Sequence, residues 1–529
     1  MDATSENARR PASAAGTPPA IELKKINKRF GPVYANRDID LAVSRGTVHG
    51  IVGENGAGKS TLMSILYGFY HADSGEILVN GKPVVIHNSS DALALGIGMV
   101  HQHFMLVDNF TVLENVILGA EDSALLKPSV DKARRELQRL ADEYGLSVPP
   151  DALIEDLSVG QQQRVEILKA LYRGADTLIL DEPTGVLTPA EADHLFKVLR
   201  TLRDEGKTII LITHKLREIM AITDMVSVMR QGQMVETLAT AETSPEQLAE
   251  LMVGRRVLLR VHKEEARPGD VLLDVNDLVV ADDAGTERLK GISLKVRAGE
   301  ILGVAGVAGN GQSELLECIA GMRAARSGTI AINGQDVTAV DEDSAAMLRR
   351  NGLAHVPEDR IRMGLVTNFY EWENAILGYH ESYGDGLILD VKAAKAEARR
   401  HIEKFDIRPA NADLKTANFS GGNQQKIVLA REMERDPEVL IVGQPTRGVD
   451  IGAIEFIHNQ IIKMRDAGKA ILLVSVELDE IRSLSDRIVV LFDGQIVGEA
   501  DPATADEGEL GLLMAGMKAD GATPAEANP

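Results

Sequence analysis

The sequence is poor in cysteine, in long apolar runs and in positive charge. Cys318 is the one cysteine among 529 residues, which excludes an internal disulfide and fits a reducing compartment. No stretch reaches about 18 consecutive apolar residues, the length that a membrane-spanning helix needs, so any membrane role requires other subunits. Lys and Arg total 57 against 79 Asp and Glu, and this acidic balance argues against a nucleic-acid partner.

The remaining composition is that of an ordinary globular protein, with 44% hydrophobic and 26% charged residues and a net charge of -22. A chain of 529 residues exceeds what one hydrophobic core usually supports, so we expect at least two domains. Residues 1–20 lack the apolar run of a signal peptide, and we predict a disordered tail there. Residues 517–529 are predicted to form a second disordered tail.

One order of motifs occurs twice along the chain. The pairs are GENGAGKS at 53–60 and GVAGNGQS at 306–313, LSVGQQQR at 157–164 and FSGGNQQK at 419–426, and TLILDEPT at 177–184 and VLIVGQPT at 439–446. A repeated order of this kind indicates tandem duplication. We therefore predict one domain over 21–258 and another over 271–516, joined by a polar linker at 259–270 that contains Pro and Gly.

Each half alternates short apolar runs rich in β-formers with helix-like stretches. The runs ILGVAGV and TLILD are typical of buried strands, and QQQRVEILKALYRG is typical of a helix. Alternation of this kind predicts an α/β fold with a mainly parallel sheet in each half.

The first glycine-rich segment has the form of a phosphate-binding loop. It matches GxxxxGK[ST], follows an apolar strand and opens a helix, as such a loop requires. Backbone N–H groups and the helix N-terminus are expected to bind phosphate, Lys59 to reach the β- and γ-phosphates, and Ser60 to ligate Mg²⁺. The predicted nucleotide-binding residues of this segment are Gly53, Glu54, Asn55, Gly56, Ala57, Gly58, Lys59, Ser60 and Thr61.

An apolar run over 178–181 ends in two carboxylates. Asp181 is predicted to hold the Mg²⁺ shell, and Glu182 to polarise the water that attacks the γ-phosphate. Taken alone, this pattern also fits a solvated strand end. Its place after a phosphate loop and before Pro183–Thr184 favours the catalytic interpretation.

These motifs together resemble the ATP-binding domains of ABC transporters. LSVGQQQR resembles the family's signature, and the ordered set covers nearly the whole chain twice. The resemblance implies that Gln102 is the Q-loop glutamine and a Mg²⁺ ligand, that His214 is the switch histidine, and that Phe30 stacks on adenine. Taken singly, these three could be a surface amide, a loop histidine and a core residue. The implied fold adds an antiparallel β subdomain and an α-helical signature subdomain to each P-loop core.

The second half has lost the residues that would perform the chemistry. Gln312 occupies the position of Lys59, and Gly443 and Gln444 occupy the positions of Asp181 and Glu182. Glu358 occupies the position of Gln102, and Val476 that of His214. No aromatic residue aligns with Phe30. Each loss alone could be tolerated. Together they leave no acid, base or metal ligand, so we predict that this half does not hydrolyse ATP with its own residues.

The signature of the second half is nevertheless the more complete one. It reads Ser420, Gly421, Gly422 and Asn423, whereas the first half carries Val159 at the first glycine position. Asp450 matches the D-loop aspartate, which the first half lacks. In ABC transporters two such domains pack head to tail and each ATP lies between the phosphate loop of one and the signature of the other. The resemblance therefore implies one complete composite site and one that is defective on both faces.

Fused domains of this kind resemble the ATP-binding subunits of monosaccharide and nucleoside importers. VHQHFMLVDNFTVLENVILG, HVPEDR and PTRGVDIGAIEFIH favour the nucleoside branch, with simple sugars such as ribose or galactose as the alternative. That branch implies two membrane permease subunits, an extracytoplasmic substrate-binding lipoprotein, and a peripheral position on the cytoplasmic face of the inner membrane. A soluble ribosome-associated twin ATPase and an ATP-binding scaffold without turnover are the other hypotheses.

Overall fold

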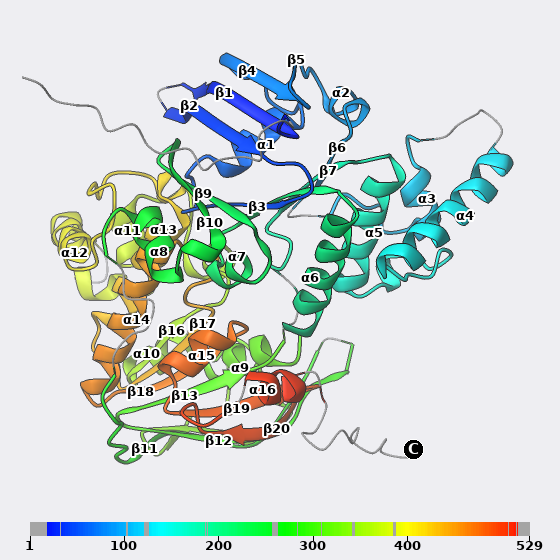
Figure 1. Ribbon diagram of the computed structural model, residues 1–529. Helices are drawn as coiled ribbons and strands as arrows, with labels where there is room; N and C mark the ends of the chain where they lie inside the picture. Colours follow the sequence, from blue (N-terminus) through cyan, green and yellow to red (C-terminus); the bar gives the residue numbers. More distant parts are fainter. Residues whose placement is uncertain are drawn as a thin grey trace, which may run out of the picture. The chain divides into compact units, whose positions relative to one another are not determined.

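The computed structural model in Figure 1 forms two compact units, Met1–Val257 and Leu258–Pro529. It describes residues 18–31, 33–101, 104–120, 126–185, 187, 189–256, 263–282, 284–307, 309–340, 344–384, 388–505, 507–514 and 516. The two predicted tails lie outside these residues except for Pro18–Ala20, where the Ala20 N–H donates to the Val43 carbonyl at 2.9 Å.

The core of the first unit is a mainly parallel sheet. Its strand order among the described residues is β10-β9-β3-β8-β7-β6, with β10 antiparallel at one edge. The strands are β3 (Val48–Gly53), β6 (Ile97–Val100), β7 (Thr177–Asp181), β8 (Thr208–Thr213), β9 (Met225–Arg230) and β10 (Gln233–Ala239). Strands β3, β7 and β8 are buried at every residue, which explains their nearly continuous apolar sequences.

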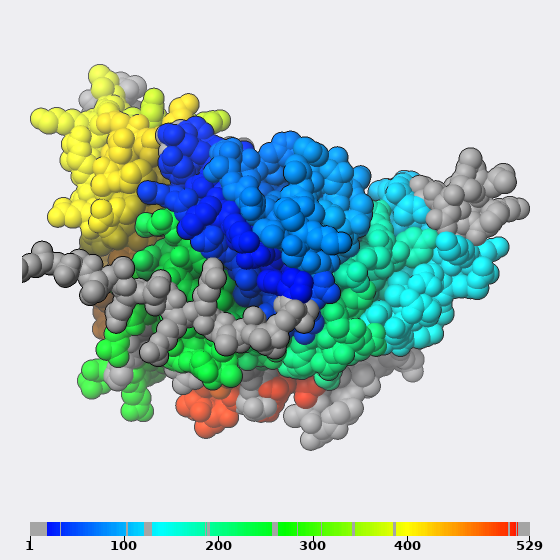
Figure 2. Space-filling model, turned by 45° about the horizontal axis from the view of Figure 1, so that its top comes forward, coloured from blue at the N-terminus to red at the C-terminus, as the bar shows by residue number. Residues whose placement is uncertain are grey.

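A second sheet of the first unit is antiparallel and lies at the surface, where it is blue in Figure 2. Its order is β2-β1-β4-β5, formed by β1 (Ile21–Phe30), β2 (Val33–Val43), β4 (Ser74–Val79) and β5 (Lys82–Val84). Ile21, Leu23 and Ile26 point from β1 into the core that this sheet shares with the helix after the glycine-rich loop.

Helices cover the core sheet of the first unit and form a separate lobe. They are α1 (Lys59–Leu66), α2 (Ser89–Ala94), α3 (Val112–Ile117), α4 (Leu126–Tyr144), α5 (Val159–Tyr172), α6 (Pro189–Asp204), α7 (Leu216–Ile222) and α8 (Pro245–Val253), with 3₁₀ turns at Ile154–Asp156 and Thr240–Glu242. In Figure 1, α3 and α4 (cyan) pack with α5 beyond the edge strand β6. This lobe corresponds to the predicted signature subdomain.

The second unit repeats both sheets. Its core sheet has the order β16-β17-β18-β13-β19-β20 and its antiparallel sheet the order β12-β11-β14-β15. The strands are β11 (Val271–Ala281), β12 (Glu287–Arg297), β13 (Glu300–Ala305), β14 (Ser327–Ile332), β15 (Gln335–Asp336), β16 (Leu353–Val356), β17 (Val439–Gly443), β18 (Ala470–Ser475), β19 (Arg487–Phe492) and β20 (Gln495–Ala500). The order is that of the first unit, as duplication predicts.

The helices of the second unit follow the same scheme. They are α9 (Gln312–Ile319), α10 (Ser344–Arg350), α11 (Glu371–Ala375), α12 (Val391–Lys404), α13 (Gly421–Met433), α14 (Ile451–Asp466), α15 (Leu478–Leu484) and α16 (Glu507–Met514), with a π turn at Arg360–Gly364 and 3₁₀ turns at His380–Tyr383 and Thr416–Asn418. The predicted parallel core, antiparallel sheet and helical lobe are thus present in both units. None of the helices in the described ranges combines the length and apolar character that a membrane crossing requires.

Part of the predicted linker packs on the second unit. Residues 257–262 lie outside the described residues, but Lys263 donates to the Leu484 carbonyl at 3.1 Å and pairs with Asp486 at 3.2 Å. The buried Arg465 donates to the Glu264 carbonyl at 3.0 Å. Residues 263 and 264 are therefore anchored to the ends of α14 and α15.

Candidate functional site

The glycine-rich loop of the first unit joins β3 to α1 in a turn that needs glycine. Gly58 has φ 98°, and an added Cβ there would lie 2.1 Å from the Ala35 carbonyl oxygen. The buried Asn36 side chain donates to the Gly58 carbonyl at 3.0 Å and holds the loop in place. Asn55 and Gly56 are exposed at the tip of the loop, and Thr61 is partly buried in the first turn of α1.

The Lys59 ammonium lies within this loop. It donates to the Gly53 carbonyl at 2.6 Å and to the Glu54 carbonyl at 3.1 Å, and the residue is 5% exposed. Burial lowers the pKa of Lys59, and the negative charges of Glu182, Asp181 and Glu54 oppose that shift. A cation in a loop of backbone N–H groups at a helix N-terminus is a site for a phosphate chain.

Asp181 ends strand β7 next to the start of α1. Burial raises the pKa of Asp181, and a hydrogen bond from the Ser60 hydroxyl and the charge of Lys59 work against this shift. A hydroxyl and a carboxylate that meet in this way offer the hard oxygen ligands that Mg²⁺ prefers. The residues present thus fit the predicted metal.

Glu182 and His214 form a close pair at the carboxyl ends of β7 and β8. Nδ1 of His214 lies 2.8 Å from Oε1 of Glu182. Burial acts to raise the pKa of Glu182, but the hydrogen bond with His214 and the charges of His214, Lys59 and Lys215 outweigh it, so the pKa lies below its usual value. An ionised carboxylate held by a histidine can accept a hydrogen bond from a water molecule and orient it.

Two further predicted residues lie at the edge of this group. Phe30 ends strand β1, is 43% exposed and meets Tyr70 edge-on with ring centroids 5.2 Å apart. Its exposure argues against the core role and is compatible with the predicted stacking on adenine. Gln102 lies outside the described residues, so its predicted metal and catalytic roles stay predictions.

The glycine-rich loop of the second unit is closed on itself by Gln312. The Gln312 amide donates to the Val307 carbonyl at 2.9 Å and accepts from the Asn310 N–H at 3.1 Å. Where Lys59 presents three donors and no acceptor, the amide satisfies both of its atoms on its own loop. Both side chains thus bond to their own loop, and the substitution removes the positive charge that would attract phosphate.

Glu358 fills the space left by the missing aspartate. The Ser313 hydroxyl donates to Glu358 at 2.5 Å, as Ser60 does to Asp181 in the first unit. An added Cβ at Gly443 would lie 2.5 Å from Cγ of Glu358, so this glycine makes room for the glutamate. Burial raises the pKa of Glu358, opposed by the Ser313 hydrogen bond. The changes in this unit compensate one another sterically.

The Gln444 side chain is also engaged internally. Gln444 has φ 47°, as Glu182 does, and its Oε1 accepts from the backbone N–H of Val476 at 3.3 Å. The strand end thus keeps its backbone conformation while both the carboxylate and the histidine are absent.

The two signature helices begin alike but differ at the first glycine position. Ser158 caps α5 in a capping box with Gln161, and the neighbouring Val159 is 41% exposed. Ser420 caps α13 by accepting from the Asn423 N–H at 3.4 Å. Both helices therefore point a serine-capped N-terminus outward from their units, and a valine side chain stands only beside the first.

Close packing explains why the second signature keeps both glycines. An added Cβ at Gly421 would lie 2.6 Å from a guanidinium nitrogen of Arg360, and one at Gly422 would lie 2.9 Å from the Asp450 carboxylate. Asp450 itself caps α14, accepting from the Ala453 N–H at 2.9 Å. Thr188, its counterpart in the first half, lies outside the described residues.

The structure brings together, within the first unit, Lys59, Ser60, Asp181, Glu182 and His214. Within the second unit it brings together Gly421, Gly422 and Asp450. Sequence reasoning missed Arg360, although HVPEDR contains it, and missed Gln163 and Glu218, which bind the loop that follows Glu182. No local pattern marks these three, because their partners are distant in sequence.

Known proteins resemble this chain over most of its length. The family model described as "ABC transporter" matches residues 36–185 and again 289–447. The nucleoside import ATP-binding protein NupA of Lactococcus lactis is 49% identical over 94% of this chain and 98% of its own length. The guanosine import ATP-binding protein NupO of Bacillus subtilis is 48% identical, over 94% and 97%. The glucose import ATP-binding protein TsgD13 of Haloferax volcanii is 45% identical, over 94% and 96%. The predicted resemblance and the predicted fold class are thereby confirmed.

Proposed function

Since this chain belongs to the ABC transporter family and carries two of its ATP-binding domains, we propose that it powers the import of nucleosides. The prediction of an ABC-type ATPase is confirmed by that membership. The observation that carries the proposal is the set of Lys59, Asp181, Glu182 and His214, held in one charged group in the first unit of a chain nearly half identical to nucleoside import proteins.

ATP is hydrolysed, in this proposal, at one composite site. The first unit supplies Lys59 and the carboxylates, and the second supplies Ser420, Gly421, Gly422, Asn423 and Asp450. Head-to-tail pairing of the two units is supported by how the defects are distributed. Gln312, Gly443 and Gln444 would share a site with Val159, whereas no substituted position falls in the other site. Selection on a single working site leaves this distribution.

The turnover uses residues of both units. Lys59 and the loop amides bind the β- and γ-phosphates, and Phe30 stacks on the adenine. Glu182, ionised and held by His214, orients a water molecule in line with the γ-phosphate. Ser420 at the N-terminus of α13 donates to the γ-phosphate from the other side. Loss of that phosphate releases the closed arrangement, as in other phosphate-driven switches.

Ser60 and Asp181, with Gln102, would hold the magnesium ion that accompanies ATP. When bound, Mg²⁺ would neutralise negative charge that develops during phosphoryl transfer. Ser60 presents its hydroxyl and Asp181 its carboxylate at the same point of the loop.

Nucleosides are the proposed cargo because two relatives named for nucleoside or guanosine import are 49% and 48% identical to this chain. Simple sugars are the alternative, favoured by the relative named for glucose import at 45%. A ribosome-associated role lacks such support. We also propose two membrane permeases as partners, an extracytoplasmic lipoprotein that delivers the cargo, and a peripheral position on the cytoplasmic face of the inner membrane.

Uptake of radiolabelled solutes by cells that lack this chain tests the cargo. Loss of nucleoside uptake, restored by the wild-type chain and not by Glu182→Gln, is the expected result. Normal nucleoside uptake together with lost ribose, galactose or glucose uptake would contradict nucleosides as the cargo and support simple sugars. Co-purification with ribosomes in place of integral membrane proteins would contradict the importer itself.

A further inference from the structure

The loop that follows Glu182 is tied from two sides by buried side chains. The Gln163 amide donates to the Pro183 carbonyl at 2.5 Å. The Thr184 hydroxyl donates to the Glu218 carboxylate. Gln163, Thr184 and Glu218 are all buried, so neither hydrogen bond competes with bulk water.

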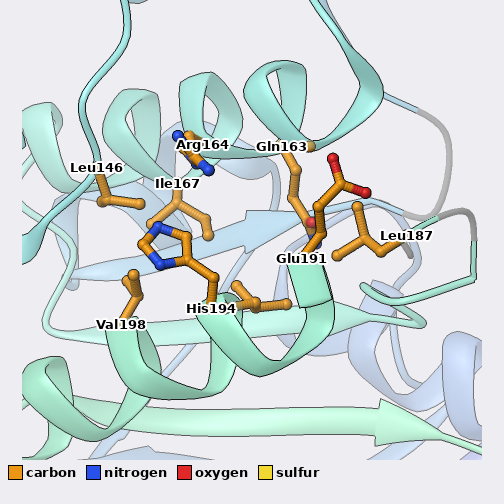
Figure 3. Close-up of a pocket in the computed structure, with 10 residues that line it drawn as sticks. Leu146, Gln163, Arg164, Ile167, Leu187, Glu191, His194 and Val198 are labelled. Carbon is orange, nitrogen blue, oxygen red and sulfur yellow. The ribbon is translucent and has the colours of Figure 1, made fainter. Parts of the chain in front are cut away.

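These two ties join three parts of the site. Gln163 lies on the signature helix α5, five residues after its capping Ser158. Figure 3 shows Gln163 reaching from α5 toward Glu191 and Leu187, in the small cleft between α5 and α6. Glu218 lies in the first turn of α7, which begins directly after His214 and Lys215. The loop after Glu182 is thus bound to the signature helix and to the histidine segment.

The backbone of Glu182 is strained, as is that of Gln444 in the second unit. The φ of 47° at both residues lies in the left-handed region, which is unfavourable for any residue with a Cβ. Conformations of this kind persist only where surrounding contacts hold them. The Glu182 N–H donates to the Ile212 carbonyl at 2.8 Å, and the Gln444 N–H donates to the Val474 carbonyl at the same distance, so both units hold this residue from one side. The first unit adds the hydrogen bonds at residues 183 and 184, which fix the loop that follows Glu182.

The second unit keeps the same residue types but not the ties. Gln425 occupies the Gln163 position, and its amide nitrogen has no hydrogen-bond partner within the described part of the chain. Glu480 occupies the Glu218 position and pairs with Nε2 of His458 at 2.9 Å. Among the described residues, the ties are therefore made only in the unit whose strand end carries the glutamate, and a purely architectural role would predict them in both.

We propose that Gln163 and Glu218 are positioning residues for ATP hydrolysis, which orient the Glu182 carboxylate through the loop that follows it. This inference rests on the proposed role of Glu182 as the residue that orients water. It gives the signature helix a second task within its own unit. A displacement of α5 would move the Pro183 carbonyl and so reorient the Glu182 carboxylate. The rate of turnover would then depend on the position of the helical lobe.

The test compares variants of the full chain in steady-state ATPase and equilibrium ATP-binding assays. Thr184→Val removes the bond to Glu218 at nearly constant volume, and Gln163→Met removes the bond to Pro183. Each is expected to lower kcat at least tenfold while the Kd for ATP changes less than twofold, because Glu182 acts after binding. Thr184→Ser restores the hydroxyl and is expected to stay within twofold of wild-type kcat. Thr446→Val, the change in the second unit that matches Thr184→Val, is expected to stay within twofold as well.

Wild-type kcat in both Thr184→Val and Gln163→Met would overturn the proposal. So would an equal loss in Thr184→Ser, or a loss of ATP affinity in proportion to kcat, since either marks a merely structural role. If Thr184→Val does not fold, Gln163→Met decides alone. Glu182→Gln is assayed in parallel: full activity there would overturn the proposed function, whereas an inactive Glu182→Gln beside wild-type tie variants would overturn only the positioning role.

Discussion

Nδ1 of His214 and Oε1 of Glu182 lie 2.8 Å apart, although the residues belong to different strand ends. Strands β7 and β8 are neighbours in the parallel sheet, so their carboxyl ends deliver both side chains to one edge. The pairing holds the glutamate ionised at a site where burial alone would favour its protonated form.

Glu182→Gln should therefore abolish turnover and retain ATP binding. The amide keeps the shape of the side chain but cannot act as a base, so we expect kcat to fall by about 10²-fold or more, the usual contribution of general acid–base catalysis. ATP binding is measured by equilibrium titration and turnover by phosphate release. Gln444→Ala is the matched control in the second unit and should leave kcat within about twofold, because that strand end lacks the carboxylates and the histidine of hydrolysis. Equal effects of the two changes would contradict the assignment.

Lys59→Ala should remove ATPase activity, and Gln312→Ala should not. The lysine is the buried cation of the first loop, and each charge-assisted bond that it makes to phosphate contributes about 1.5–3 kcal/mol. The Gln312 amide bonds only to its own loop within the described residues. Phosphate release at saturating ATP separates the two variants. Activity that survives Lys59→Ala would show that the second loop also supports hydrolysis.

Gly443→Asp should destabilise the second unit instead of restoring its chemistry. The new Cβ would meet Cγ of Glu358 at 2.5 Å, and overpacking of this kind costs about 1–3 kcal/mol. Glu358→Ala removes that Cγ, so the double variant should recover part of the loss. Thermal unfolding of the two single variants and the double variant measures the coupling. Additive effects would contradict the steric relation.

The loss of chemistry in the second half could be predicted from the sequence, but its structural consequence could not. The missing lysine, carboxylates and histidine stand in motifs whose spacing is local, and the glycine-rich loop and strand ends form where the patterns place them. That Glu358 moves into the space at Gly443 depends on contacts between β16, β17 and α9, which no spacing along the chain reveals. The hydrogen bonds that Gln163 and Glu218 make to the loop after Glu182 could not be predicted for the same reason.

Glu371 illustrates a polar residue whose burial the sequence conceals. It follows Tyr370 at the start of α11, a place where acidic residues are usually exposed, yet it is 0% exposed and neither oxygen has a partner among the described residues. The first unit carries the buried Val112 at the same point of its lobe, just after the capping Thr111. Burial raises the pKa of Glu371 to about 8.

Glu371→Val should therefore stabilise the second unit, and more so at high pH. In the unfolded chain this carboxyl loses its proton near pH 4.5, whereas in the folded unit it keeps the proton until about pH 8. The unfolded state binds fewer protons in that window, so stability falls as pH rises through it. We expect a gain of about 2–4 kcal/mol at pH 8 and a smaller gain at pH 5. Thermal unfolding at the two pH values measures it, and a gain independent of pH would contradict the buried-acid explanation.

The most direct test of the composite site is the steady-state kcat of Ser420→Ala beside that of Ser158→Ala in the full chain. Both serines cap the N-terminus of a signature helix, so each change costs about 1 kcal/mol of local stability, whereas the composite site gives only Ser420 a bond to the γ-phosphate. Ser420→Ala should lower kcat by about tenfold or more, the loss of one charge-assisted bond to the γ-phosphate, while Ser158→Ala should stay within about twofold. Loss of activity in Ser158→Ala with wild-type activity in Ser420→Ala would contradict the account.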